Sequence, residues 1–241
     1  EDVGSASRWT VDGIRFEMTR EIDHFDGTFD ARVVLESPKA VAIHGFELPV
    51  SMTTRLQIGQ DGAFGGVRFH VRGAAGKLVP AGNPGPALPI RSLVVGGQLS
   101  KDADRVEVDG LALGVGSAKL EATASLPASD FPHGVVLWGQ LKSVSVADLK
   151  RLWPRGAAVG AREWIDAHIH DGGVPSGSFV IRLPPAEATP KPLAADAVDV
   201  KFEFAGLEVN YYGELDPARE ERGTGILSAQ TFEGRGTQAQ G

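Results

Sequence analysis

The longest regular pattern in the chain is an alternation of apolar and polar residues between positions 46 and 58. Apolar side chains occupy even positions, namely Phe46, Leu48, Val50, Met52, Leu56 and Ile58, while Glu47, Ser51 and Arg55 stand between them. Successive side chains of a strand point to opposite faces, so this pattern predicts a strand with one apolar and one wet face. Its length would be about 40 Å at roughly 3.3 Å per residue, against a usual strand of about 5–6 residues.

Shorter stretches of the same kind lie on both sides of this strand. We expect further strands at 8–18, 25–35, 67–71, 93–99, 105–115, 118–126, 135–141, 179–183, 202–211 and 225–232. The runs rich in Pro and Gly at 78–89 and 184–192 are expected to be loops. The pattern therefore predicts a mainly β protein with a long, curved, mostly antiparallel sheet that forms an open groove.

One stretch, 145–173, has helical rather than strand periodicity. Ser145 is expected to cap a first helix, with Asp148 as its capping-box partner, and that helix should end at Trp153 before a proline. Gly172 and Gly173 are expected to stop a second helix. The apolar stripe of this second helix comprises Ala158, Ala161, Trp164, Ile165, His168 and Ile169. We therefore expect one inserted helical pair within 146–169.

A six-residue pattern (apolar, any, Gly, apolar, any, apolar) recurs at 11–16, 43–48, 64–69, 108–113 and 204–209. The parity of the apolar positions changes at each glycine. Asp12–Gly13 and Asp109–Gly110 suit a two-residue turn, whereas His44–Gly45, Gly65–Gly66 and Ala205–Gly206 suit a bulge within one strand. Repeated bulges would curl the sheet into a trough.

Composition narrows the class of protein. A chain of 241 residues with 42% hydrophobic residues, 31 Gly and 15 Pro is typical of a turn-rich globular β protein. The net charge of −7 argues against nucleic acid as a partner. No run approaches the roughly 20 apolar residues of a spanning helix. The absence of cysteine excludes disulfides and thiol chemistry, which fits either a periplasm or a cytosol.

Residues that could carry chemistry are few. The sequence contains no phosphate-binding loop, nucleophile elbow or H-E-x-x-H motif, so we expect no enzyme, no catalytic residue and no cofactor. His168, His170 and Asp171 invite a metal, but two histidines two apart on a helix diverge by about 200°, which favours a solvated helix end. Glu163 and Asp166 are more typical of a wet helix face than of a catalytic carboxylate pair.

The remaining aromatic and histidine residues allow two interpretations. Trp153 and Trp164 are expected in the core, with stacking on a ligand as the alternative. The scattered histidines, His24, His44, His70 and His133, are expected at the surface. The apolar stripes themselves fit either an ordinary closed core or an open trough whose floor holds acyl chains.

The helical stretch, L-K-R-L-W-P-R-G-A-A-V-G-A-R-E-W-I-D-A-H-I-H-D-G-G-V at 149–174, resembles a segment of the AsmA-like envelope proteins, the YhdP branch in particular. The matching anchors are Trp153–Pro154, Ala161–Arg162 and Trp164–Ile165. The stretches 202–218 and 223–232 are similar to the part of those proteins that lies C-terminal to this segment. The stretch 108–126 is similar in composition to the part that lies N-terminal to it. Members of the family are anchored in the inner membrane of diderm bacteria and extend a β-groove through the periplasm. The anchor itself is absent here, as expected of a periplasmic piece of a longer protein.

The resemblance implies a bridge-like protein that moves phospholipid between the inner and outer membranes. It implies a groove segment at 1–144, a helical insertion at 145–172 and a continuation of the groove at 173–241. The expected partners are phospholipid acyl chains and the inner membrane, the latter through an anchor outside this segment. The residues expected to contact acyl chains are Phe46, Leu48, Val50, Met52, Leu56, Ile58, Val67, Phe69, Val71, Val108, Leu111, Leu113, Leu120, Leu137, Phe179, Ile181, Phe202 and Phe204. The alternative function is a structural or assembly module of the envelope with a closed core, whose helices dock a partner.

Overall fold

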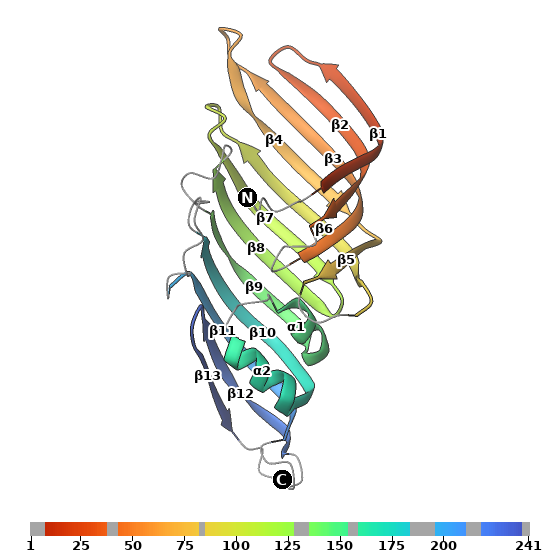
Figure 1. Ribbon diagram of the computed structural model, residues 1–241. Coiled ribbons are helices and arrows are strands. Elements are labelled where there is room, and N and C mark those ends of the chain that lie inside the picture. Colours follow the sequence, from red (N-terminus) through yellow and green to blue (C-terminus); the bar gives the residue numbers. More distant parts are fainter. Residues whose placement is uncertain are drawn as a thin grey trace, which may run out of the picture.

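The computed structural model describes residues 8–37, 43–81, 85–127, 135–153, 159–183, 196–210 and 218–237. These residues form one sheet of 13 strands and two helices (Figure 1). The strands are β1 (Arg8–Arg20), β2 (His24–Glu36), β3 (Ile43–Ile58), β4 (Phe64–Gly73), β5 (Gly76–Pro80), β6 (Leu88–Leu99), β7 (Arg105–Val115), β8 (Ala118–Pro127), β9 (Val135–Ser145), β10 (Ile169–Leu183), β11 (Val198–Val209), β12 (Ala218–Ser228) and β13 (Phe232–Thr237). The predicted mainly β class is confirmed.

The strands follow one another across the sheet in chain order. Every strand pairing in the described residues is antiparallel. Strands β1 and β13 lie at opposite ends of the strand order, so the sheet is an open, curved meander and no closed barrel (Figure 1). The predicted open, curved and antiparallel sheet is therefore what the structure contains.

The predicted loop at 78–89 was wrong at both of its ends. Strand β5 includes Leu78 and Pro80, and β6 begins at Leu88. Both β4 and β5 pair with β3 on one side and β6 on the other. They therefore form one interrupted column, broken at Ala74 and at Ala75, which has a φ of 57°. Pro80 is tolerated because it stands at the end of its strand, where a ladder donor is dispensable.

The recurring glycine pattern marks bulges. Pairing shifts register at Asp12/Arg15 in β1, at Val108/Leu111 in β7 and at Phe204/Leu207 in β11. It also shifts at Ile43/Gly45 between β3 and β5, and at Gln57/Ile58 opposite Gly65–Gly66. The two-residue turns considered for Asp12–Gly13 and Asp109–Gly110 are therefore wrong, because each strand keeps the same partner before and after the glycine. An extra residue restores the apolar parity without ending the strand.

Helix α1 spans Val146–Leu152 and begins as predicted. The Ser145 hydroxyl accepts a hydrogen bond from the Asp148 backbone N–H at 3.2 Å, which satisfies one free donor of the first turn. The Asp148 carboxylate does not complete a capping box. It accepts instead from the backbone N–H and hydroxyl of Ser117, at 2.6 and 2.7 Å, and so fastens the start of α1 to the β7–β8 turn.

Helix α2 spans Val159–His168, and its predicted stop at Gly172–Gly173 was wrong. Strand β10 begins directly at Ile169, which pairs with Val209, and the Asn210 N–H donates to the His168 carbonyl oxygen at 2.8 Å. Both glycines lie inside β10, where the pairing with β11 shifts register and Gly172 has a φ of 104°. Sheet pairing, rather than the glycines, therefore ends the helix. Ala158, expected on the α2 stripe, lies outside the described residues.

Candidate functional site: an apolar groove

One face of the sheet carries an uninterrupted apolar row. Residues directly opposite each other in an antiparallel pair share a face, so the pairings can be followed from strand to strand. The row that passes through Met52 comprises Phe16, Phe29, Met52, Val71, Val95, Leu111, Ala122, Gly139, Phe179, Val200, Leu227 and Phe232. None of these residues is polar, and the row runs from β1 to β13. We call this side of the sheet the groove face.

All residues predicted to contact acyl chains lie on the groove face. They are Phe46, Leu48, Val50, Met52, Leu56 and Ile58 of β3; Val67, Phe69 and Val71 of β4; Val108, Leu111 and Leu113 of β7; Leu120 of β8; Leu137 of β9; Phe179 and Ile181 of β10; and Phe202 and Phe204 of β11. Leu48 and Phe179 are buried, and the others are half-buried. The structure thus places residues from seven separate strands on one continuous surface.

The prediction missed several large groove-face residues. They are Phe16 and Met18 of β1, Phe25 and Phe29 of β2, Leu93 and Val95 of β6, Val200 of β11, and Leu227 of β12. Most of these strands were predicted as elements, and alternation within each would have identified the face. On β1 the apolar side chains are the least covered, with Phe16 and Met18 each 56% exposed.

The groove face is open to solvent over most of its length. No large side chain in the described part of the chain is completely buried. The chain exposes 15128 Å² of accessible surface, whereas a compact monomer of this size exposes roughly 10,000 Å². A closed sandwich would bury its stripes between two sheets. Here the apolar side chains of the groove face are shielded mainly by side chains of adjacent strands in the same curved sheet.

Polar side chains predominate on the opposite face, which also exposes Val94, Val136, Trp138 and Ile226, and some of them pair across strands. Arg32 of β2 contacts Glu47 of β3 at 2.7 Å, and Lys142 of β9 contacts Glu121 of β8 at 3.2 Å. These pairs are exposed, so each stabilises the sheet only slightly. The charged residues of these pairs make this face more polar than the groove face.

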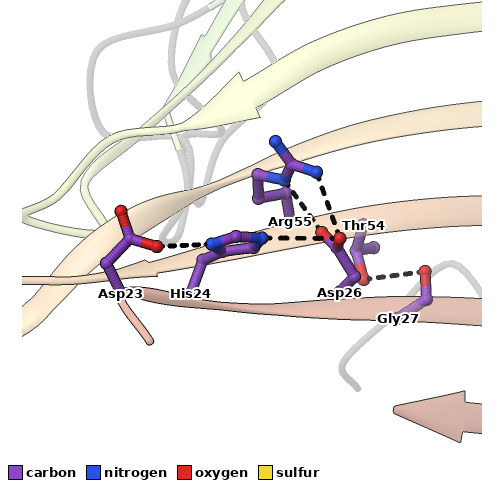
Figure 2. A network of polar contacts seen from close by, with 6 residues as sticks. All are labelled: Asp23, His24, Asp26, Gly27, Thr54 and Arg55. Atoms are coloured by element: carbon purple, nitrogen blue, oxygen red, sulfur yellow. Dashed lines mark hydrogen bonds and ion pairs between the residues drawn. The ribbon is translucent and has the colours of Figure 1, made fainter. Parts of the chain in front are cut away.

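A polar network of this face lies where β2 begins (Figure 2). The Arg55 guanidinium donates to both carboxylate oxygens of Asp26, at 2.8 and 3.0 Å, and His24 lies between Asp23 and Asp26. The hydrogen bond from Arg55 lowers the pKa of Asp26, and Asp26 in turn raises the pKa of Arg55. The hydrogen bond with His24 lowers the pKa of Asp23. His24 and Asp26 are half-buried, Asp23 and Arg55 are exposed, and the network ties β2 to β3.

The helical pair roofs one section of the groove. A cavity of about 600 Å³ lies between the two helices and strands β9–β13. Trp153 and Ile165 of the roof pack with Leu207 and Val209 of the floor. The remaining wall includes Ile181, Val198, Val200, Phe202, Leu227 and Phe232. This volume is within the range of about 300–1,000 Å³ that is usual for ligand pockets.

Polar contacts hold the roof together. The Lys150 ammonium on α1 donates to the carbonyl oxygens of Asp166 and Ile169, at 3.2 and 2.7 Å. A cation at these carbonyls complements the negative end of the α2 dipole. Arg162 contacts Asp166 at 3.6 Å, one turn along α2. The end of α2 is therefore fixed to α1 as well as to the sheet.

The two tryptophans of the helical pair differ in burial. Trp153 is 6% exposed and belongs to the core, as predicted. Trp164 is 39% exposed, so the core prediction was wrong for this residue. Its indole stacks on the His168 ring, with centroids 5.1 Å apart, and lies at the edge of the roofed cavity. The buried side of α2 is occupied by Ile165, the residue next to Trp164.

The other candidate residues are spread over separate places. Glu163 is exposed, and Asp166 contacts Arg162. His170 and Asp171 are exposed in β10, and His168 contacts the Trp164 carbonyl oxygen. Within the described residues, no three His, Cys, Asp or Glu side chains are grouped closely enough to hold a metal ion.

The histidines expected at the surface have various surroundings. His24 belongs to the polar network, and His70 accepts a hydrogen bond from Arg72 at 3.1 Å. His44 is half-buried in β3, and His133 lies outside the described residues.

Comparison of the chain with protein-family models, with curated proteins and with solved structures finds no match. Neither of the described helices has the length and hydropathy needed to cross a bilayer.

Proposed function

We propose that the groove face carries lipid acyl chains, and that the chain is a periplasmic segment of a bridge-like protein that moves phospholipid between the inner and outer membranes. The observation that carries this proposal is the apolar row from β1 to β13, which is continuous and is roofed by the helical pair only over β9–β13. An exposed apolar surface of this length requires an apolar occupant in water. Each acyl CH₂ that leaves water on this surface contributes about 0.8 kcal/mol.

The shape of the sheet supports lipid rather than a compact ligand. Strands lie side by side along the groove, so a chain that moves along it meets similar apolar side chains at each strand. The phosphates of the head groups would stay in water at the open side, which avoids the cost of burying them. Such transport needs no nucleophile, base or metal, so we propose no enzymatic activity.

The resemblance of 149–174 to AsmA-like envelope proteins adds the cellular setting. It supports a periplasmic location, an inner-membrane anchor outside this segment and phospholipid as the cargo. The alternative is a structural or assembly module of the envelope whose helices dock a partner; the open sheet favours the lipid proposal over it, because that alternative was expected to have a closed β core.

Native mass spectrometry of the chain, purified from bacterial cells without harsh detergent, tests the proposal. We expect phospholipid bound to the chain, and we expect solvent extraction of the same purified protein to release that phospholipid. A purified, folded chain that carries no lipid and takes up none from phospholipid vesicles would contradict the proposal.

A further inference from the structure

Glu221 of β12 places a carboxylate among apolar groups. Its side chain is 9% exposed, and it is the single charged residue among the described ones that line the roofed cavity. It lies opposite Leu207, so it belongs to the groove face. By strand alternation, Arg222 and Arg235 project from the polar face and so do not face this carboxylate.

The Glu221 carboxylate has no partner in the described part of the chain. Neither a hydrogen bond nor an ion pair joins it to another described group. The carboxylate oxygens are not among the fully buried unpaired side-chain atoms of the described residues, so they keep some contact with solvent beside the apolar wall. A ligand that supplies a positive charge or N–H donors can therefore reach and pair with this carboxylate.

The neighbour of the Glu221 carboxylate on β13 has no side chain to cover it. This neighbour is Gly236, where a methyl group would stand 3.4 Å from Oε2. Further along the groove face of β12, the rings of Phe204 and Phe202 lie over Gly223 and Gly225 and continue the apolar wall of the same cavity. A polar group at Glu221 is thus contiguous with a surface suited to an acyl chain.

We propose that Glu221 receives the primary ammonium of a lipid head group, such as an ethanolamine, while an acyl chain of that lipid lies in the cavity beneath α1 and α2. This inference rests on the proposed lipid carriage and specifies the class of lipid that the roofed section selects. A primary ammonium offers three N–H donors and a charge opposite to the carboxylate. A trimethylammonium has no donor, and a net-anionic head group would be repelled.

Competition between lipids with identical acyl chains tests this selection. The full chain is incubated with vesicles of equal parts dioleoyl phosphatidylethanolamine and dioleoyl phosphatidylglycerol, and bound lipid is identified by native mass spectrometry. We expect the parent to retain the ethanolamine lipid at least threefold over the glycerol lipid. Glu221→Gln should bring that ratio close to one with total lipid unchanged. Glu233→Gln, on the polar face of the adjacent strand, should keep the parental ratio.

A second series changes the lipid rather than the protein, so it does not depend on how a variant folds. Replacing the ethanolamine lipid by its choline counterpart removes the N–H donors and should lower retention by the parent several-fold. Equal retention of all head groups, or a parental ratio in Glu221→Gln, would overturn this inference and leave the lipid-bridge proposal intact. A parent that retains no lipid of any kind would contradict both.

Discussion

The phenyl ring of Phe202 on β11 lies over the backbone of Gly225, its cross-strand partner on β12. A methyl group at position 225 would stand 2.7 Å from Cε2 of the ring and closer still to Cζ. The same ring stacks towards Phe232 of β13, with centroids 6.1 Å apart. The floor of the roofed cavity is therefore formed by aromatic rings that lie on glycines.

Gly225→Ala should destabilise the fold by about 1–3 kcal/mol, because the new methyl group overpacks the floor and forces Phe202 from its position. Urea unfolding followed by circular dichroism measures this difference. Gly234→Ala is the matched control: Gly234 lies opposite Gly225, and its added methyl would meet Phe232 at an ordinary 3.6 Å. Equal stability of the two variants would mean that Phe202 does not depend on Gly225.

Gly66→Ala should destabilise the chain by about 1–3 kcal/mol through backbone strain. Gly66 has a φ of 108°, which L side chains rarely adopt, and a methyl group there would stand 2.8 Å from the Leu99 carbonyl oxygen. Gly110, in the corresponding pattern of β7, has no atom within 4 Å of a built methyl group. Gly110→Ala should therefore be tolerated, and unchanged thermal midpoints for both variants would contradict the bulge argument.

Gly45→Val should also destabilise the sheet, but for a reason other than the positive φ expected from the sequence. Gly45 has no positive φ. A side chain at this position would instead meet the Leu35 carbonyl oxygen at 2.5 Å across the β2–β3 pair. We expect a loss of roughly 1–3 kcal/mol in unfolding free energy, which is typical of overpacking. A neutral result would show that β2 and β3 can move apart without cost.

At low pH the sheet should lose the contribution of the Asp26–Arg55 pair. The hydrogen bond from Arg55 holds the pKa of Asp26 below its ordinary value. A carboxyl group with a depressed folded pKa stabilises the fold above its unfolded pKa of about 4 and loses that effect as the pH falls through the folded value. The difference in urea midpoint between the parent and Asp26→Asn should thus be present at pH 7 and shrink as the pH falls below about 4 and through the lowered folded pKa of Asp26. A difference that stays constant over this interval would contradict the assignment.

The faces of the sheet could be predicted from the sequence, whereas the connections could not. Alternation from Phe46 to Ile58 identified the groove face, because one face is apolar and register is then fixed by burial. Strand β5 was missed because its five residues lie beside a run of Pro and Gly, and its pairing with β3 depends on residues far away in sequence.

The special position of Glu221 could not be predicted either. The sequence around it is R-E-E-R, which is typical of a solvated surface. Its place on the groove face results from the register with Leu207, which itself depends on the bulge between Phe204 and Leu207. The residues around Glu221 predict neither the register shift in β11 nor the position of the helical pair over β9–β13.

Lipid retention by Met52→Glu tests the central claim most directly. Met52 lies on the groove face in the middle of β3, between Phe29 and Val71, and is half-buried. Because the groove is open, a glutamate there can extend its carboxylate to water, so the domain should stay folded while acyl chains are excluded. Thr53→Glu places the same charge on the polar face and serves as the control. With native mass spectrometry as the readout and circular dichroism as the check on folding, we predict a folded Met52→Glu chain without phospholipid and a Thr53→Glu chain with the parental amount. A folded Met52→Glu chain that retains the parental phospholipid would contradict the account.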